Sequence, residues 1–151
     1  MADRVDWLMR VKDAERERIV VGVALDLLHR RLTTDPSELA ERGLNAADLA
    51  AARSHLDRTF LLRMVTEFEA ALRDYWRGGV GRRSEPQLKT LIDGVASRRK
   101  LPTGLLADVH AVRERRNALV HRDGPPPAGG ATPAADRRTL NRFLAALPPR
   151  W

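Results

Sequence analysis

The chain has 151 residues, of which 43% are hydrophobic, and its formal net charge is +7. It contains no cysteine, which excludes disulfide bonds, cysteine nucleophiles and thiolate metal sites, and no apolar run approaches the roughly 18 residues of a membrane-spanning helix. The length predicts one domain, and the N-terminus lacks the apolar stretch of a secretion signal, so we expect a cytoplasmic protein without membrane contact. The positive charge, almost all from arginine, suits a polyanionic partner but does not require one.

The first half of the chain predicts two long helices separated by a short one. Residues 3–32 form either one helix or two, because the stretch 10–18 is heavily charged. Gly22 weakens this helix by roughly 1 kcal/mol, which suggests close packing against a neighbour. Asp35 and Pro36 then start a short helix that ends at Gly43.

The second long helix is predicted over residues 46–77. Asn45 is its expected cap with Asp48 at the third position, and no helix breaker follows before Gly78. A helix of this length spans about 48 Å. Leu61, Leu62 and Val65 add apolar surface to several faces of its middle, so we expect that middle to be buried nearly all round, by its own domain or by a second copy.

The connector over residues 77–84 mixes glycine with arginine and lacks the features of a phosphate-binding P-loop. This composition fits either a solvated hinge or a segment that guides RNA.

Pro86 then opens a helix that runs to about Ala96, and a basic cluster follows at residues 98–100, suited to a helix C-terminus. After the next helix, residues 124–133 form a Pro/Gly linker that we expect to be flexible, and residues 134–147 form a last helix.

The helix predicted over residues 103–121, with Thr103 as its cap, carries an unusual residue on its apolar stripe. The stripe reads Leu105, Val109, Val112, position 116 and Leu119, and position 116 is an arginine. Burying a guanidinium costs several kcal/mol unless a carboxylate, a phosphate or a water-filled cleft receives it. Arg116 therefore either snorkels or pairs with a core acid such as Glu67 or Glu69, or it serves a functional site.

Two further polar residues follow Arg116 on the same helix. Asn117 and His121 are four residues apart, so their side chains can touch. His121 lies about 140° from Arg116 around an ideal helix, which means that one straight helix cannot aim both side chains at the same atom. Either the last turn of the helix loosens, or a second subunit completes the site. As a bland alternative, His121 is a cation that the helix C-terminus favours.

The run Arg116-Asn117-Ala118-Leu119-Val120-His121 resembles the Arg-X4–6-His motif of the HEPN superfamily. The organisation of most of the chain is also similar: a long helix, a connecting region, the motif helix and a final short helix. The resemblance implies an all-α, HEPN-like bundle of about five to six helices with antiparallel core helices, in many relatives a homodimer.

If the chain behaves as active members of this family do, it is a metal-independent endoribonuclease that needs no cofactor. The resemblance implies that Arg116 binds the scissile phosphate, that His121 acts as general base or acid, and that Asn117 orients the histidine or bonds a phosphate oxygen. The 2′-hydroxyl of RNA would attack the adjacent phosphate and leave a 2′,3′-cyclic phosphate. We expect further arginines to contact the RNA backbone, namely Arg113, Arg115, Arg122, Arg82 and Arg83.

Two functions other than a toxin-like ribonuclease remain open at the level of the sequence. The first is a non-catalytic HEPN-like module that binds RNA, a nucleotide or a partner protein. Relatives often stand beside a nucleotidyltransferase that acts as antitoxin. A helical DNA-binding regulator is a weaker option, because no helix-turn-helix pair with a basic recognition helix is recognisable. His-Glu-x-x-His zinc sites, glycosidase carboxylate pairs and dinucleotide fingerprints are missing.

Overall fold

The fold is all-helical over the part of the chain that the computed structural model describes, residues 3–121 and 131–151. Within these residues, no helix is both long and apolar enough to cross a membrane. The stretch 122–130, which holds Arg122 and most of the predicted linker, lies outside the described residues. The helices are α1 (Arg4–Thr34), α2 (Ser37–Ala40), α3 (Ala46–Gly78), α4 (Leu88–Arg99), α5 (Thr103–His121) and α6 (Pro133–Ala145).

The two long predicted helices are present, and each is continuous. α1 is one helix through its charged middle, which settles the choice between one helix and two. Asn45 caps α3 as predicted: its Oδ1 accepts from the amides of Ala47 (2.8 Å) and Asp48 (3.2 Å), and Asp48 Oδ2 accepts from the Asn45 amide (2.9 Å). This reciprocal capping box satisfies backbone donors that the first turn leaves unpaired.

Most predicted helix boundaries are correct to within two or three residues. Asp35 Oδ1 accepts from the Ser37 amide, but the N-cap residue of α2 is Pro36 rather than Asp35, and the helix begins at Ser37. α2 stops at Ala40, and the chain turns before Gly43, whose φ is 70°. α4 begins at Leu88 rather than at Pro86 and ends at Arg99, where the left-handed Lys100 (φ 52°) stops it. Helix α5 begins at Thr103 itself, so Thr103 is not its cap.

The last helix also differs slightly from its prediction. Thr132 caps it by accepting a hydrogen bond from the Ala135 amide, and α6 therefore begins at Pro133, a favourable first position. It ends at Ala145 rather than at residue 147.

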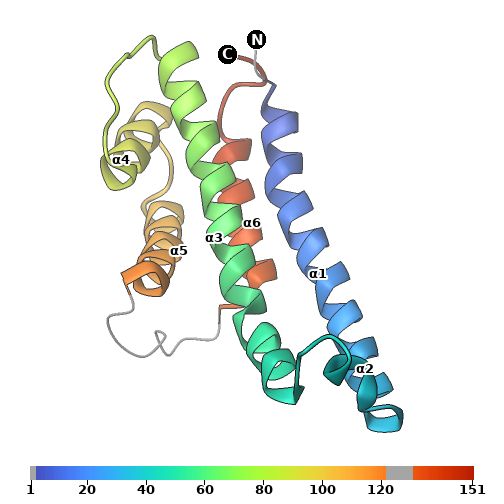
Figure 1. The fold of residues 1–151 in the computed structure, drawn as a ribbon. Coiled ribbons are helices and arrows are strands. Elements are labelled where there is room, and N and C mark those ends of the chain that lie inside the picture. Colours follow the sequence, from blue (N-terminus) through green and yellow to red (C-terminus); the bar gives the residue numbers. More distant parts are fainter. Residues whose placement is uncertain (1–2, 122–130) are drawn as a thin grey trace.

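α3 is the central helix of the bundle. Figure 1 shows α1 antiparallel to it on one side, α6 packed beside both, and α4 and α5 on the other side. Leu61 and Val65 are no more than 7% exposed, as predicted, but Leu62 is only partly buried. Arg63 and Thr66 are exposed, so the prediction that the middle of this helix is buried nearly all round is wrong for a single copy. Phe68 of α3 meets Phe143 of α6 edge to face, with 5.5 Å between ring centroids.

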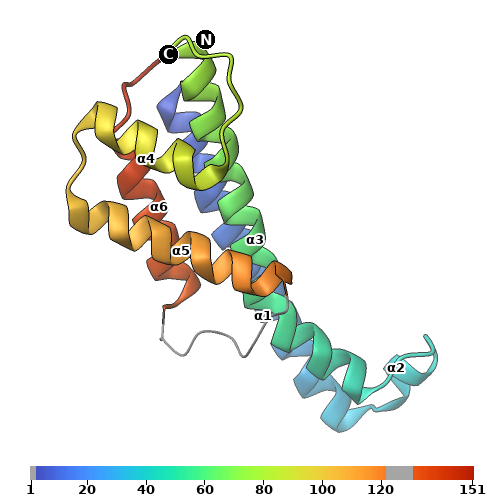
Figure 2. The ribbon, with the colours of Figure 1, turned by 90° about the vertical axis from the view of Figure 1, so that its left-hand side faces the viewer.

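The far ends of α1 and α3 project beyond the bundle. Arg137, in the second turn of α6, pairs with Glu15 of α1 at 2.5 Å, so α1 beyond about residue 18 lies past the beginning of α6. We call residues 18–57, which comprise the end of α1, α2 and the start of α3, the arm. Figures 1 and 2 show the arm as the ends of α1 and α3 with α2 at their tip, and neither α5 nor α6 covers it.

Candidate functional site at the end of helix α5

The stripe of α5 faces the core as its sequence predicts. Leu105, Val109 and Val112 are 8%, 0% and 1% exposed. Arg116 and Leu119 continue the stripe in the last turns of the helix, and both are partly buried. The fold thus holds a guanidinium group where the apolar stripe approaches the edge of the core.

Arg116 is not neutralised by the acids that the sequence suggested. Glu67 lies 3.9 Å from Arg10, and Glu69 lies 2.6 Å from Arg73, so the predicted pairing with either acid is wrong. Among the described residues, no carboxylate oxygen comes within 4.0 Å of the Arg116 guanidinium.

The contact that holds Arg116 comes from the adjacent residue of the motif. Arg116 Nη1 donates to Asn117 Oδ1 at 3.0 Å, and Arg116 Nε is buried without a partner among the described atoms. A neutral amide orients a guanidinium without cancelling its charge. Arg116 therefore keeps a positive charge in a partly desolvated place, where it attracts an anion more strongly than a fully exposed arginine does.

Arg115, the preceding residue, has a different surrounding. Its Nη2 donates to Asp136 Oδ1 of α6, and Asp136 is only 4% exposed. Burial raises the pKa of the Asp136 carboxyl, while the hydrogen bond and charge of Arg115 act in the opposite direction. This ion pair holds α5 against α6. Arg115, which the sequence predicts as an RNA contact, is therefore already paired with Asp136 in the fold.

Arg58 of α3 is a component of the site that sequence reasoning missed. Its Nη2 donates to the backbone carbonyl of Leu119 at 2.5 Å. That carbonyl is one of the last four of α5, which have no partner within the helix, so Arg58 both caps α5 and adds a cation there. The two residues are 61 positions apart, and only the packing of α5 against α3 brings them together.

The remaining predicted RNA contacts fall into two groups. Arg113 lies one turn before Arg116; its side chain is 16% exposed, and its bond to the exposed Glu114 (3.3 Å) is open to screening by water. Arg82 and Arg83 are exposed in the connector after α3, at the opposite end of that helix from the arm (Figure 1). From Arg58 to the end of α3 the helix rises about 30 Å, so these two arginines belong to a separate surface.

His121 is the last residue of α5, and its side chain lies outside the described ones. The backbone is helical through this residue, so the last turn does not loosen before it. The two motif positions thus stay about 140° apart around the helix axis.

We call Arg58, Arg113, Arg116 and Asn117 the arginine cluster. Arg113, Arg116 and Asn117 lie in the second half of α5, where Asn117 orients Arg116, and Arg58 of α3 contacts the Leu119 carbonyl near the end of the same helix. Guanidinium forks bind phosphate oxygens in a bidentate manner and stay protonated at any physiological pH. The cluster is therefore suited to hold a phosphodiester and to stabilise negative charge that builds up on it.

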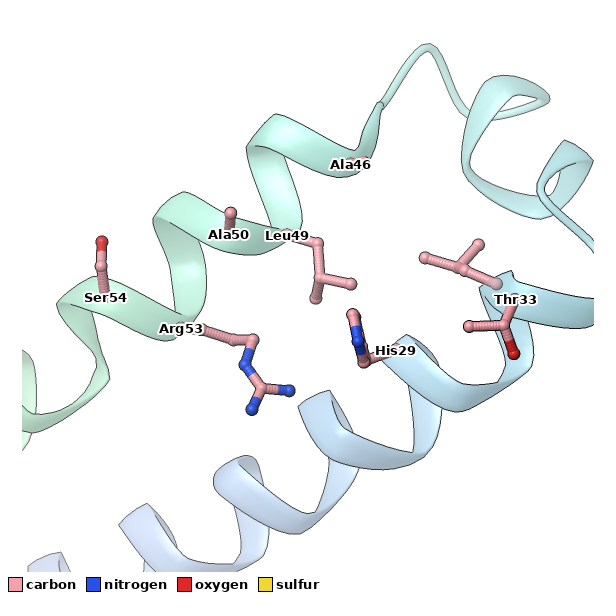
Figure 3. A pocket seen from close by; sticks show the side chains of 8 residues that line it. His29, Thr33, Ala46, Leu49, Ala50, Arg53 and Ser54 are labelled. Atoms are coloured by element: carbon pink, nitrogen blue, oxygen red, sulfur yellow. The ribbon is translucent and has the colours of Figure 1, made fainter.

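Two other polar or hollow features lie away from the arginine cluster. His110 Nε2 lies 2.7 Å from Asp93 Oδ1 and ties α5 to α4, about 120° around α5 from Arg116, so it does not share the arginine cluster. A hollow of about 720 Å³ lies on the arm rather than beside Arg116, and Figure 3 shows His29 and Leu49 facing each other across it. Within residues 3–121 and 131–151, no three acidic or histidine side chains gather in a way that would hold a metal ion.

Comparison of the chain with models of protein families, with curated proteins and with solved structures gives no significant match.

Proposed function

We propose that this chain is a HEPN-like, metal-independent endoribonuclease that acts as a homodimer. The observation that carries the proposal is Arg116: a partly buried guanidinium on an apolar stripe, oriented by Asn117, with no carboxylate among the described residues to neutralise it. Arg115, the neighbouring arginine, by contrast has the buried acid Asp136 beside it.

In the proposed reaction, the 2′-oxygen of a ribose attacks the adjacent phosphorus while a base takes the 2′-hydroxyl proton. A new 2′-O–P bond forms, the P–O5′ bond breaks, and the departing 5′-oxygen receives a proton. The products are a 2′,3′-cyclic phosphate and a 5′-hydroxyl end. His121 moves protons, because an imidazole titrates near neutral pH. Arg116 binds the phosphate and stabilises the charge on its oxygens in the transition state.

A second copy enters the proposal for a geometric reason. Positions 116 and 121 lie about 140° apart around one helix, so we assign the histidine of one copy to a phosphate held by the other. The RNA, a second copy and an antitoxin such as a nucleotidyltransferase are the proposed partners, which the chain would meet in the cytoplasm.

The test is cleavage of RNA by the purified full chain in EDTA. We expect Arg116→Ala and His121→Ala each to abolish cleavage. Arg138→Ala is the matched control, because it removes one exposed arginine of α6 outside the arginine cluster and should leave cleavage unchanged. Cleavage that survives both motif substitutions would refute the assignment.

One observation favours a non-catalytic module as the second candidate. Within a single copy the helical backbone keeps Arg116 and His121 apart, which suits an arginine that only binds. For that function we expect RNA binding that Arg116→Ala weakens, together with no cleavage at any enzyme concentration.

A further inference from the structure

The outer side of the arm carries apolar side chains that no described element covers. Four of them lie on α1 and are more than half exposed: Ile19 (51%), Val20 (67%), Val23 (54%) and Leu27 (58%). At 100° per residue all four fall within an arc of about 100°. An apolar stripe of that width is typical of a helix face that packs against a partner.

A groove beside this stripe continues the surface of α1 and α3 against which α6 packs. Glu15, which pairs with Arg137 of α6, lies about 40° from Ile19 around α1, so the side of α1 against which α6 packs runs on into the arm. There a hollow of about 330 Å³ is lined by Ile19 and Val23 of α1 and Leu56 of α3. The hollow of Figure 3 follows near the arm's tip. α6 thus completes a three-helix arrangement in the bundle, and nothing in the described structure completes it in the arm.

We propose that the arm of a second copy of this chain covers this surface, so that two arms form a four-helix bundle. The part of α1 in the arm has 17 residues and is about 25 Å long, and two helices side by side are about 20 Å wide. Such a face buries about 500 Å² on each copy and about 1,000 Å² in the pair, which reaches the lower limit for a specific interface.

The charges of the groove favour a second copy over a charged partner. Arg18 pairs with Asp57 at 2.6 Å, and Arg53 pairs with Asp26 at 2.7 Å. Each cation that lines the groove is thus matched by a carboxylate of the same copy. These two pairs add no net charge to the groove, so a nucleic acid or an acidic helix would gain little attraction from them. Exposed Arg30, about 20° from Ile19 around α1, lies at the far end of the stripe.

This inference concerns association alone, because the stripe lies on α1, on the far side of α3 from α5 and the proposed site (Figure 1). It does not depend on cleavage, so its test measures association in the absence of RNA. A chain that dimerises through the arm yet cleaves nothing would refute the nuclease and leave the arm interface standing.

The experiment is sedimentation equilibrium of the full chain over a hundredfold concentration range around the micromolar. We expect a dimer. Val23→Glu should weaken association by about 100-fold or more, because a symmetric interface receives the buried charge twice. Val5→Glu is the matched control: it makes the same change at a 56% exposed valine of α1 outside the arm, and the dimer should persist.

Circular dichroism of each variant checks folding, and Leu27→Glu replaces Val23→Glu if the latter unfolds. A wild-type chain that stays monomeric over the whole range, or a dimer that resists both arm substitutions, would overturn the inference. A dimer that Val5→Glu disrupts as strongly as Val23→Glu would overturn it as well.

Discussion

Arg115 and Arg116 are neighbours on α5, but replacing each by alanine should change the stability of the fold by very different amounts. Arg115 compensates a carboxylate of Asp136 that is only 4% exposed. Removing a buried ion-pair partner leaves the other charge uncompensated, which typically costs about 3 to 5 kcal/mol. For Arg115→Ala we therefore expect the free energy of unfolding at pH 7 to fall by about 3 kcal/mol.

The structure also sets an upper limit on that loss, because Asp136 can take up a proton instead of staying charged. An aspartate has an ordinary pKa of 3.8, and protonating it at pH 7 requires about 4.5 kcal/mol at roughly 1.4 kcal/mol per pH unit. The loss should not exceed this value.

The pH dependence of this variant gives an independent check. Asp136 has a raised pKa in the folded chain, so it binds its proton more tightly there than in the unfolded chain. Its contribution to the free energy of unfolding is therefore largest at pH values below 3.8 and is lost as the pH rises through the raised pKa. In Arg115→Ala the buried carboxylate has no counter-charge, so this loss of stability between low and neutral pH is larger than in the wild type. The free energies of unfolding of the variant and the wild type should therefore converge as the pH falls from 7 toward 4.

Urea unfolding monitored by circular dichroism at several pH values measures both effects. Adding Asp136→Asn to Arg115→Ala should restore part of the lost stability at pH 7, because it removes the buried charge. Arg116→Ala is the comparison and should change the free energy of unfolding by less than about 1 kcal/mol, since it removes one hydrogen bond and no ion pair. A loss below about 1 kcal/mol for Arg115→Ala, or a loss that does not vary with pH, would refute this reasoning.

Three further predictions concern single positions. Gly22→Ala should raise the free energy of unfolding by about 0.5 to 1 kcal/mol in urea titrations, because a Cβ there meets Leu56 Cδ2 at an ordinary 3.4 Å; a loss of stability would mean that the helices are closer. Asn45→Ala should lower it by about 1 kcal/mol through loss of the capping box, and an unchanged midpoint would contradict that role. Arg58→Ala should speed amide hydrogen exchange in the last turn of α5 and weaken RNA binding; unchanged protection would count against Arg58 as its cap.

Local features of the fold could be predicted from the sequence, because their causes lie within a few residues. The capping box of Asn45 and Asp48 and the continuous α3 follow from neighbouring residues and from the lack of a breaker before Gly78. The burial of Leu105, Val109 and Val112 follows from helical periodicity.

Features that depend on packing between distant segments could not be predicted. The sequence predicts Arg115 as an RNA contact, because nothing near it in the chain points to Asp136, its partner 21 residues away on another helix. Arg58 has no sequence pattern that points to the end of α5. The arm likewise follows from where α6 begins relative to α1, although both helices were predicted with nearly the right lengths.

The chemistry of the cleaved ends tests the central claim most directly. The full chain is incubated in EDTA with an RNA oligonucleotide and with a copy that carries a single 2′-deoxy residue at the cleaved position. Mass spectrometry should find 2′,3′-cyclic phosphate and 5′-hydroxyl ends on the RNA, and the 2′-deoxy copy should stay intact at that position. Cleavage of the 2′-deoxy position, products with 5′-phosphate ends, or no cleavage at all would contradict an Arg116-assisted attack by the 2′-hydroxyl.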